Sequence, residues 1–265
     1  MDPTAQFKEQ QKINWANFSL FENMTGSVAA RLVSFAGIKA GAKVLDVGCG
    51  SGVVGLTAAR RGARATGVDL TPELIAHAKE NSELMGIAAE WLQGDAEALP
   101  VPDASFDFVV SQFGHMFAPR PDVAVREMLR VLKPGGVIAF STWPPEMFTG
   151  RMFALNGKYA PPPPPGVAPP GQWGDPSIVR ERLGAAVKDI TFGRDVMLLQ
   201  MLSPQHFRIF METNFVPLKR LLAGLDKSEP TKGNALRREL EQLAAEYFEN
   251  NVIRQDFLLT RAVKV

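Results

Sequence analysis

A glycine-rich turn is the feature of this sequence best suited to holding a ligand. The segment Val44–Gly52 starts with a hydrophobic run and then contains three closely spaced glycines: Gly48, Gly50 and Gly52. Glycines let the backbone turn sharply and approach a ligand without interference from a Cβ atom. Asp69 ends the next hydrophobic run, where an acid can accept hydrogen bonds from both hydroxyls of a ribose. These residues predict a site for an adenosine-containing ligand.

Two kinds of cofactor compete for such a turn. A nicotinamide dinucleotide site requires a third small residue where this chain has Val53. It must also hold a pyrophosphate at the start of the following helix. Asp46 adds negative charge near that place, which favours a cation with a sulfonium and an ammonium group over a diphosphate. We therefore expect S-adenosylmethionine, with a nicotinamide-linked dehydrogenase as the alternative.

His115 is the candidate catalytic residue among three histidines. It follows the fourth predicted strand, and open α/β sheets bind ligands beyond the carboxyl ends of their strands. A sulfonium methyl group is already activated, so transfer mainly requires alignment and exclusion of water. A base such as His115 helps only if the acceptor must lose a proton. His77 is expected at the surface, and His206 is expected in a cap helix, either packed or exposed to solvent. No cysteine–histidine spacing suggests a metal site, and Cys49 is read as a small residue in the turn.

The hydrophobic pattern predicts the elements that position these residues. Short apolar runs alternate with amphipathic stretches from residue 43 to 143, which is typical of a parallel sheet covered on both faces. We expect an α/β fold, with a Rossmann-like, doubly wound, mostly parallel seven-stranded sheet whose last strand is antiparallel, and an inserted helical cap. The expected strands are 43–47, 64–68, 89–93, 106–111, 137–142, 187–202 and 252–263. Expected helices include 53–61, one from Pro72 to Gly86, and 123–132.

We expect one domain over residues 1–265. Its parts are N-terminal helices (1–40), a cofactor-binding core (41–143), a proline-rich loop with a short helix (144–186), and two last strands (187–265) with a cap at about 203–250. The prolines at 161–165 favour a stiff surface loop over a docking motif. The cap offers aromatic and sulfur side chains that line an acceptor pocket or form a separate small core: Tyr159, Trp173, Phe207, Phe210, Met211 and Phe215.

Composition argues against several functions. The net charge of +1 lacks the basic excess typical of nucleic-acid binders. No apolar stretch approaches the roughly 20 residues needed to span a bilayer, and the first residues lack the apolar core of a signal peptide. A single cysteine suits a reducing compartment, so we expect a cytoplasmic protein. The sequence leaves monomer and homodimer open.

Several motifs together resemble the class I S-adenosylmethionine-dependent methyltransferases. Val44–Gly52 resembles their first motif, and the others follow in order over roughly residues 40 to 143: Gly67–Leu70, Gly94–Pro100, Phe106–Ser111 and Leu129–Gly136. The branch most resembled methylates small molecules and includes quinone-biosynthesis enzymes. Methyltransferases of nucleic-acid amino groups carry Asn or Asp before Pro-Pro-Tyr or Pro-Pro-Phe, whereas this chain has Ser111–Gly114. Action on RNA or protein, and cofactor binding without catalysis, remain as alternatives.

The resemblance implies a role for each matched position. Beneath the cofactor and around its methionine part it places Asp46, Gly48, Gly50 and Gly52, with the backbone of Ser111 and Gln112 facing the methionine part. Around the ribose and adenine it places Asp69, Leu70, Asp95 and Ala96. Trp15, on an expected N-terminal helix, would close over the cofactor. The implied reaction is in-line methyl transfer to an apolar or aromatic small molecule.

Overall fold

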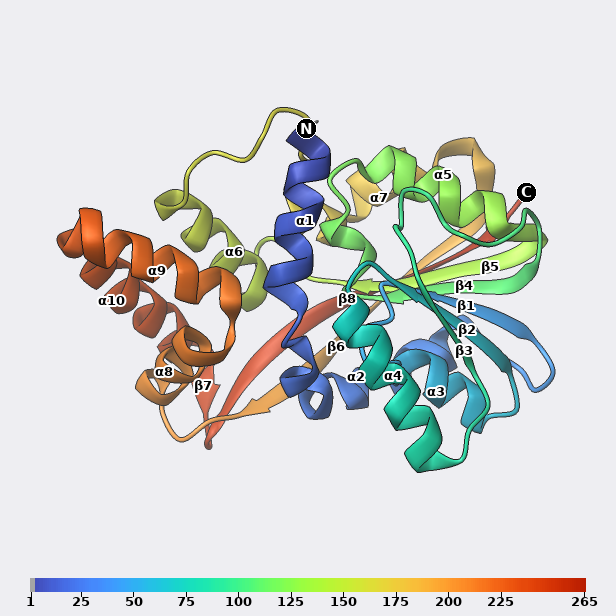
Figure 1. Ribbon diagram of the computed structural model, residues 1–265, viewed down its shortest axis with the longest axis horizontal. Helices are drawn as coiled ribbons and strands as arrows, with labels where there is room; N and C mark the ends of the chain where they lie inside the picture. The colour runs from blue at the N-terminus through green and yellow to red at the C-terminus, as the bar shows by residue number, and fades with distance from the viewer. Residues whose placement is uncertain (1–2) are drawn as a thin grey trace.

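One sheet runs through the molecule. The computed structural model describes residues 3–265, and within them eight strands pair in the order β3-β2-β1-β4-β5-β8-β6, with β7 added on β8 (Figure 1). The strands are β1 (Lys43–Val47), β2 (Arg64–Asp69), β3 (Glu90–Gln93), β4 (Phe106–Gln112), β5 (Leu132–Thr142), β6 (Val187–Gln200), β7 (Phe248–Glu249) and β8 (Val252–Lys264). The expected Rossmann-like sheet is confirmed, with the two-residue β7 as an addition.

The strand directions bring the predicted ligand-binding turns to one edge. β1 pairs in parallel with β2 and β4, and β4 pairs in parallel with β5. β8 is antiparallel to both β5 and β6. Parallel neighbours end on the same side, so the loops after β1, β2, β3 and β4 meet there. These strands are largely buried because helices cover both faces.

Helices form a layer on each face of the sheet. Figure 1 shows α2 (Glu22–Ala36), α3 (Val53–Arg60) and α4 (Pro72–Met85) on one face, with α5 (Pro121–Val131) and α7 (Pro176–Leu183) on the other. Local signals set several ends. Pro72 starts α4 and Gly86 ends it with a left-handed φ of 62°. Asp175 caps α7 by accepting from the Ser177 amide.

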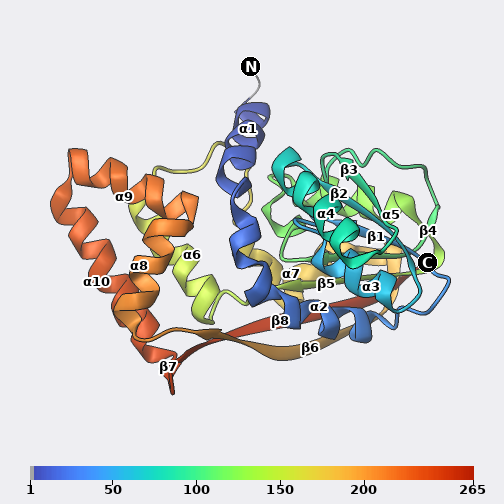
Figure 2. The same cartoon turned by 60° about the horizontal axis from the view of Figure 1, so that its bottom comes forward.

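The cap stands at one end of β6 and β8, apart from the sheet layers (Figure 2). It consists of α6 (Phe148–Tyr159), α8 (Pro204–Asn214), α9 (Val216–Ser228) and α10 (Pro230–Glu246). Its helices share an apolar cluster separate from the main core beside the sheet. The long first helix, α1 (Pro3–Trp15), lies between the cap and the sheet in both views.

Several elements differ from the sequence-based expectations. Helix α6 occupies part of the segment expected to be a proline-rich loop, which is confined to the stretch after Tyr159. The cap, expected only as a helical insertion at about 203–250, contains α9 and also α10, which begins at Pro230 and ends at Glu246. Strand β5 starts at Leu132, because β4 pairs first with Leu132 and next with Val137, leaving the intervening glycine turn as a bulge.

Residues 3–265 contain no helix of the length and apolarity that crossing a bilayer requires.

Candidate functional site

The glycine turn after β1 lies against the loop after β4. Gly48 has a φ of 65°, and a Cβ atom there would come within 2.9 Å of the Gly114 Cα. Only glycine fits that approach. Gly50 also has a positive φ, 56°, but a Cβ atom there would meet nothing within 4 Å. Both residues line one large cavity. The turn therefore offers open backbone to a ligand.

Gly52 serves packing instead. A Cβ atom at Gly52 would lie 2.6 Å from the Trp91 ring, and Gly52 is absent from the cavity lining. A Cβ atom at Gly55 or Gly67 would also meet that indole, whose Nε1 donates to the Ser82 hydroxyl at 2.7 Å. The expectation that Gly52 lies beneath a cofactor is therefore wrong for this structure. Its small size makes room for a buried tryptophan.

Asp46 is a buried carboxylate with an unused acceptor. Its Oδ2 accepts from the Gly55 amide at 3.0 Å, while its Oδ1 is buried with no partner among the described residues. Burial raises the pKa of Asp46 to about 7, the Gly55 hydrogen bond opposes this, and nearby Asp69 adds to it. The residue lines the cavity. An unpaired buried carboxylate is costly, so the site favours a cationic donor.

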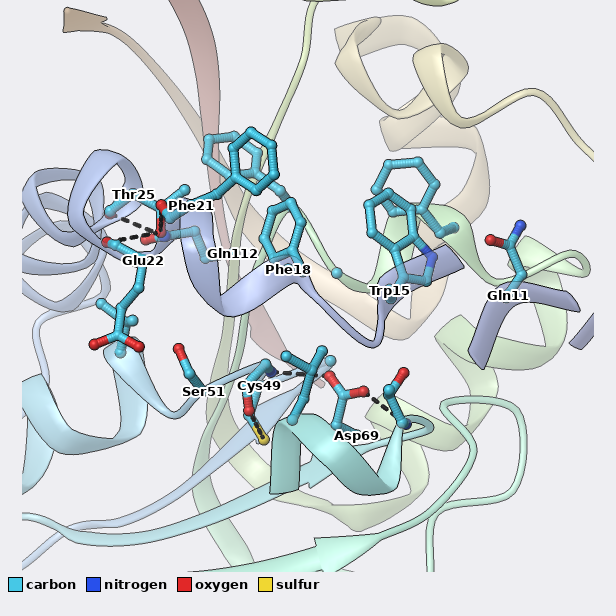
Figure 3. Close-up of a pocket in the computed structure, with 18 of the residues that line it drawn as sticks. Gln11, Trp15, Phe18, Phe21, Glu22, Thr25, Cys49, Ser51, Asp69 and Gln112 are labelled. Carbon is cyan, nitrogen blue, oxygen red and sulfur yellow. Dashed lines mark hydrogen bonds between the residues drawn. The ribbon is translucent and has the colours of Figure 1, made fainter. Parts of the chain in front are cut away.

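Asp69 ends β2 and faces the glycine turn across the cavity floor (Figure 3). Its Oδ2 accepts from the Gly50 amide at 2.8 Å, and its Oδ1 accepts from the Thr71 amide at 2.9 Å. These bonds fix the carboxylate, and each oxygen keeps a further lone pair. Burial raises the pKa of Asp69, against the lowering effect of the hydrogen bonds. The geometry leaves both oxygens able to accept from a diol.

Asp95 lies on the cavity lining after β3, together with Ala96 and Leu70. Its Oδ2 pairs with the Lys8 ammonium at 2.5 Å, and its Oδ1 accepts from the Glu97 amide at 2.9 Å. Lys8 also pairs with buried Glu97 at 2.6 Å. Helix α1 is therefore held by a cation to the part of the cavity expected to receive adenine.

An aromatic row covers the cavity opposite the glycine turn. Figure 3 shows Trp15, Phe18 and Phe21 along one side, with Cys49 and Asp69 on the other. The Trp15 ring lies 4.6 Å from the Phe117 ring and 5.9 Å from the Phe215 ring, measured between centroids. Trp15 thus lines the cavity and also joins α1 to the cap.

Ser111 and Gln112, at the end of β4, have different surroundings. The Ser111 hydroxyl donates to the Val47 carbonyl at 2.6 Å and accepts from the His115 amide at 3.0 Å. Ser111 is fully buried and outside the cavity lining, so of the two residues whose backbone was expected to face the methionine part only Gln112 reaches the cavity. Gln112 lines the cavity; its Nε2 donates to the Thr25 carbonyl at 3.1 Å, and its buried Oε1 has no partner among residues 3–265.

His115 does not face the cavity, which corrects the proposed catalytic role. Its ring packs against Phe140 and Trp173 at centroid distances of 4.5 and 4.6 Å. Neither ring nitrogen has a partner within the described chain. Burial, assisted by the charge of Arg182, lowers the pKa of His115 to about 3. The turn after β4 sends this side chain into the core between Phe140 of β5 and Trp173, where it is neutral.

Beyond Gln112 the cavity opens into a region that we call the cap-side chamber. It lies between β6, β8 and the cap, and its lining residues are Trp143, Phe148, Thr149, Met152, Phe153, Met197, Leu199, Phe207, Met211, Phe215 and Gln255. Among the cap residues anticipated from sequence, Phe207, Met211 and Phe215 line it and also belong to the cap's apolar cluster. Tyr159, Trp173 and Phe210 do not line it.

Several lining residues were missed by the sequence analysis. Phe113 stacks on Trp143 at 3.8 Å, with a left-handed φ of 58° that holds its ring on the cavity wall. Both directly follow strands whose carboxyl ends form the ligand-binding edge, so this position could have identified them. Lys8, Thr149 and Gln255 carry no such signal, because tertiary packing alone brings them to the cavity.

The cavity fits a cationic adenosyl ligand. Two buried acceptors without donors line it, Asp46 Oδ1 and Gln112 Oε1, and Asp69 stands nearby to receive a diol. Among the described residues, no group of three His, Cys, Asp or Glu side chains is placed to hold a metal ion. Fold and site together define a Rossmann-like protein with a site for a positively charged adenosine cofactor.

Comparison with known proteins agrees with this class. The methyltransferase-domain family matches residues 45–140. An uncharacterized protein of Mycobacterium tuberculosis is 33% identical over 244 residues, covering 92% of this chain and 89% of that protein. A demethylmenaquinone methyltransferase of Thermus thermophilus is 37% identical over 117 residues, 43% of this chain and 53% of that protein. The chain belongs to the class I S-adenosylmethionine-dependent methyltransferases, and S-adenosylmethionine is its cofactor.

Solved structures share the fold at low sequence identity. A putative methyltransferase from Bacillus halodurans aligns with a TM-score of 0.60 and 22% identity, covering 90% of this chain and 99% of that one. Phosphoethanolamine N-methyltransferase 2 of Haemonchus contortus, in complex with S-adenosylmethionine, aligns with a TM-score of 0.57 and 18% identity, covering 90% of this chain and 52% of that one. These likenesses support the fold.

Proposed function

We propose that this methyltransferase acts on an apolar small molecule held in the cap-side chamber. The observation that carries the proposal is the chamber's lining of aromatic, leucine and methionine side chains. Apolar pockets with a few placed polar groups are typical of small-molecule sites. Trp15, Phe18 and Phe21 cover the cavity on the side opposite Cys49 and Asp69, and a covered cavity suits a small acceptor better than a folded macromolecule.

The cofactor's contacts are part of the proposal. Asp69 would accept from the ribose hydroxyls, and Asp46 with Gln112 would accept from the ammonium end. Gly48 and Gly50 would lie beneath the methionine part, with Leu70 and Ala96 beside the adenine. Asp95 would accept from the adenine amino group, in competition with Lys8. Each role uses a residue on the cavity lining.

The chain's contribution to the reaction is alignment and exclusion of water. When bound, the cofactor supplies a methyl group that is already activated toward displacement. Within the described residues, the chamber lining contains no titratable side chain that could serve as a base. The enzyme therefore suits acceptors that need no proton removed before attack, or that are ionised in solution. The apolar wall keeps water from competing for the methyl group.

Labelled cofactor tests this proposal. Protein given S-adenosylmethionine with a ¹⁴C-methyl group should transfer label to members of a panel of apolar aromatic and carbonyl compounds. Transfer to RNA or protein, with none to the panel, would contradict it. Asp69→Ala should abolish transfer through lost cofactor binding. Met152→Trp should fill the chamber and abolish transfer. Its affinity for S-adenosylhomocysteine should stay within about threefold of the wild-type value, a smaller change than the loss of one hydrogen bond would cause.

The comparison with known proteins supports a small acceptor. The Thermus thermophilus relative is named for methylating demethylmenaquinone, a small apolar molecule, although it aligns with only 43% of this chain. Because that alignment leaves more than half of this chain uncovered, the acceptor's identity depends on the chamber itself. The net charge of +1 also gives no electrostatic basis for binding a polyanion.

A further inference from the structure

One hydrogen-bonded pair interrupts the apolar wall of the cap-side chamber. Gln255 lies on β8, and Thr149 lies in the first turn of α6. Both are buried, with exposed fractions of 7% and 6%, and both line the cavity. The Thr149 hydroxyl donates to Gln255 Oε1 at 3.1 Å. A bond between these two distant segments fixes the orientation of the Gln255 amide.

The chamber residues next to this pair in the sheet and on α6 are apolar. Met197 of β6 pairs directly with Gln255 of β8, so their side chains lie on the same face of the sheet. Phe148 precedes Thr149 on α6, and Met152 lies one turn further on. A polar amide in such a wall costs free energy unless both of its ends find partners.

Only one end of the amide is used within the protein. Thr149 holds the oxygen, whereas Gln255 Nε2 has no hydrogen-bond partner among the described residues, which include every side chain named for the chamber. A glutamine amide carries two N–H donors on that nitrogen. The pair therefore presents N–H donors, in a fixed direction, to whatever fills the chamber.

We infer that Gln255 is a specificity-determining residue that donates a hydrogen bond to an oxygen of the methyl acceptor, with Thr149 as its positioning residue. This inference rests on the proposed function of the chamber. The acceptor class it defines is an apolar molecule bearing a carbonyl or phenolate oxygen away from the attacking atom. Apolar contacts hold the body of that molecule, and the single donor sets which way round it lies, thereby aiming one atom at the cofactor.

Two matched probes test the inference: 1-tetralone and tetralin, which differ by one carbonyl oxygen. Their affinities are measured by equilibrium dialysis with S-adenosylhomocysteine saturating. Gln255→Met keeps the size of the side chain and removes the donor. We expect this substitution to lower the affinity for 1-tetralone about tenfold, which corresponds to the free energy of one hydrogen bond. The affinity for tetralin should stay unchanged or increase. Thr149→Val should lower the affinity for 1-tetralone by a smaller factor, because the Gln255 amide remains but is no longer held in one orientation by the Thr149 hydroxyl.

Met197→Leu is the control, since it alters the wall beside Gln255 without changing any donor. This control variant should change the affinities for both probes by the same factor. Equal effects of Gln255→Met on the two probes, with both still bound, would overturn this inference and leave the proposed function standing. Failure of both probes to bind the wild-type protein would overturn both. Unchanged affinity for S-adenosylhomocysteine in each variant establishes that the fold and cofactor site are intact.

Discussion

Asp46→Asn should strengthen the fold of the cofactor-free protein and weaken cofactor binding. Asn keeps an oxygen for the Gly55 amide and replaces the unpartnered, buried Oδ1 with a neutral group. In the native protein the Asp46 carboxylate has a pKa of about 7, raised chiefly by burial. Its ordinary value in the unfolded chain is 3.8. The folded state therefore holds a proton that the unfolded chain has already released.

The sign and size of the effect follow from this difference. As pH rises from about 4 to 7, the unfolded chain gains from ionising while the native carboxyl stays protonated, so stability falls. One pKa unit corresponds to about 1.4 kcal/mol, so the cost above pH 7 reaches about 4 kcal/mol. Asp46→Asn removes this cost. The variant should gain up to that amount at pH 8 and almost nothing at pH 4.

Cofactor binding should instead require the ionised carboxylate, because Asp46 would accept from the ammonium group that S-adenosylmethionine and S-adenosylhomocysteine share. Calorimetry in buffers of different ionisation enthalpy should record about 0.9 proton released per S-adenosylhomocysteine at pH 6 and about 0.1 at pH 8, as a pKa of about 7 requires. Asp46→Asn should abolish this release, and Asp95→Asn should retain it. Two results would contradict the raised pKa of Asp46. One is wild-type binding without proton release at pH 6, and the other is an unchanged dependence of stability on pH in Asp46→Asn.

Three further substitutions test the site's geometry. Gly50→Val should reduce cofactor affinity by more than about 100-fold with a modest loss of stability, since its side chain would stand over open cavity floor at a φ of 56°. Isothermal titration beside a melting curve separates the two effects. Gly52→Ala should do the reverse: a Cβ atom 2.6 Å from the Trp91 ring should cost roughly 1–3 kcal/mol in denaturant unfolding, while folded protein binds cofactor normally. If a stably folded Gly52→Ala variant failed to bind the cofactor, Gly52 would belong to the cofactor site after all. His115→Leu should leave methyl transfer unchanged and reduce acid sensitivity, because the native pKa of about 3 lies below the ordinary 6.5, so stability is lost as pH falls between these values. At pH 4.5 the gain should be about 3 kcal/mol; equal acid sensitivity in variant and wild type would contradict it.

The cofactor half could be predicted from sequence because its signals are local. A run such as Lys43–Val47 indicates a buried parallel strand without knowledge of its neighbours. Gly86 marks the end of its helix in the same local way. Order and spacing of the motifs then place the ligand at the carboxyl ends of the strands.

The remainder depends on contacts that no local pattern carries. Gly52 and Gly50 look alike in sequence, yet only the packing of Trp91 assigns the first to the core. His115 follows the correct strand, but the turn after β4 aims it away from the cavity. Gln255 lies in a strand that was predicted from its apolar neighbours. Its place in the chamber wall could not be predicted, because it depends on the packing of Thr149 of α6 against it.

The most direct test of this account is a crystal structure of the complex with S-adenosylhomocysteine. We expect the ribose hydroxyls on the Asp69 carboxylate, the amino group near Asp46 and Gln112, and the sulfur facing the cap-side chamber. A complex in which the ribose lies away from Asp69, or the sulfur points away from that chamber, would contradict it.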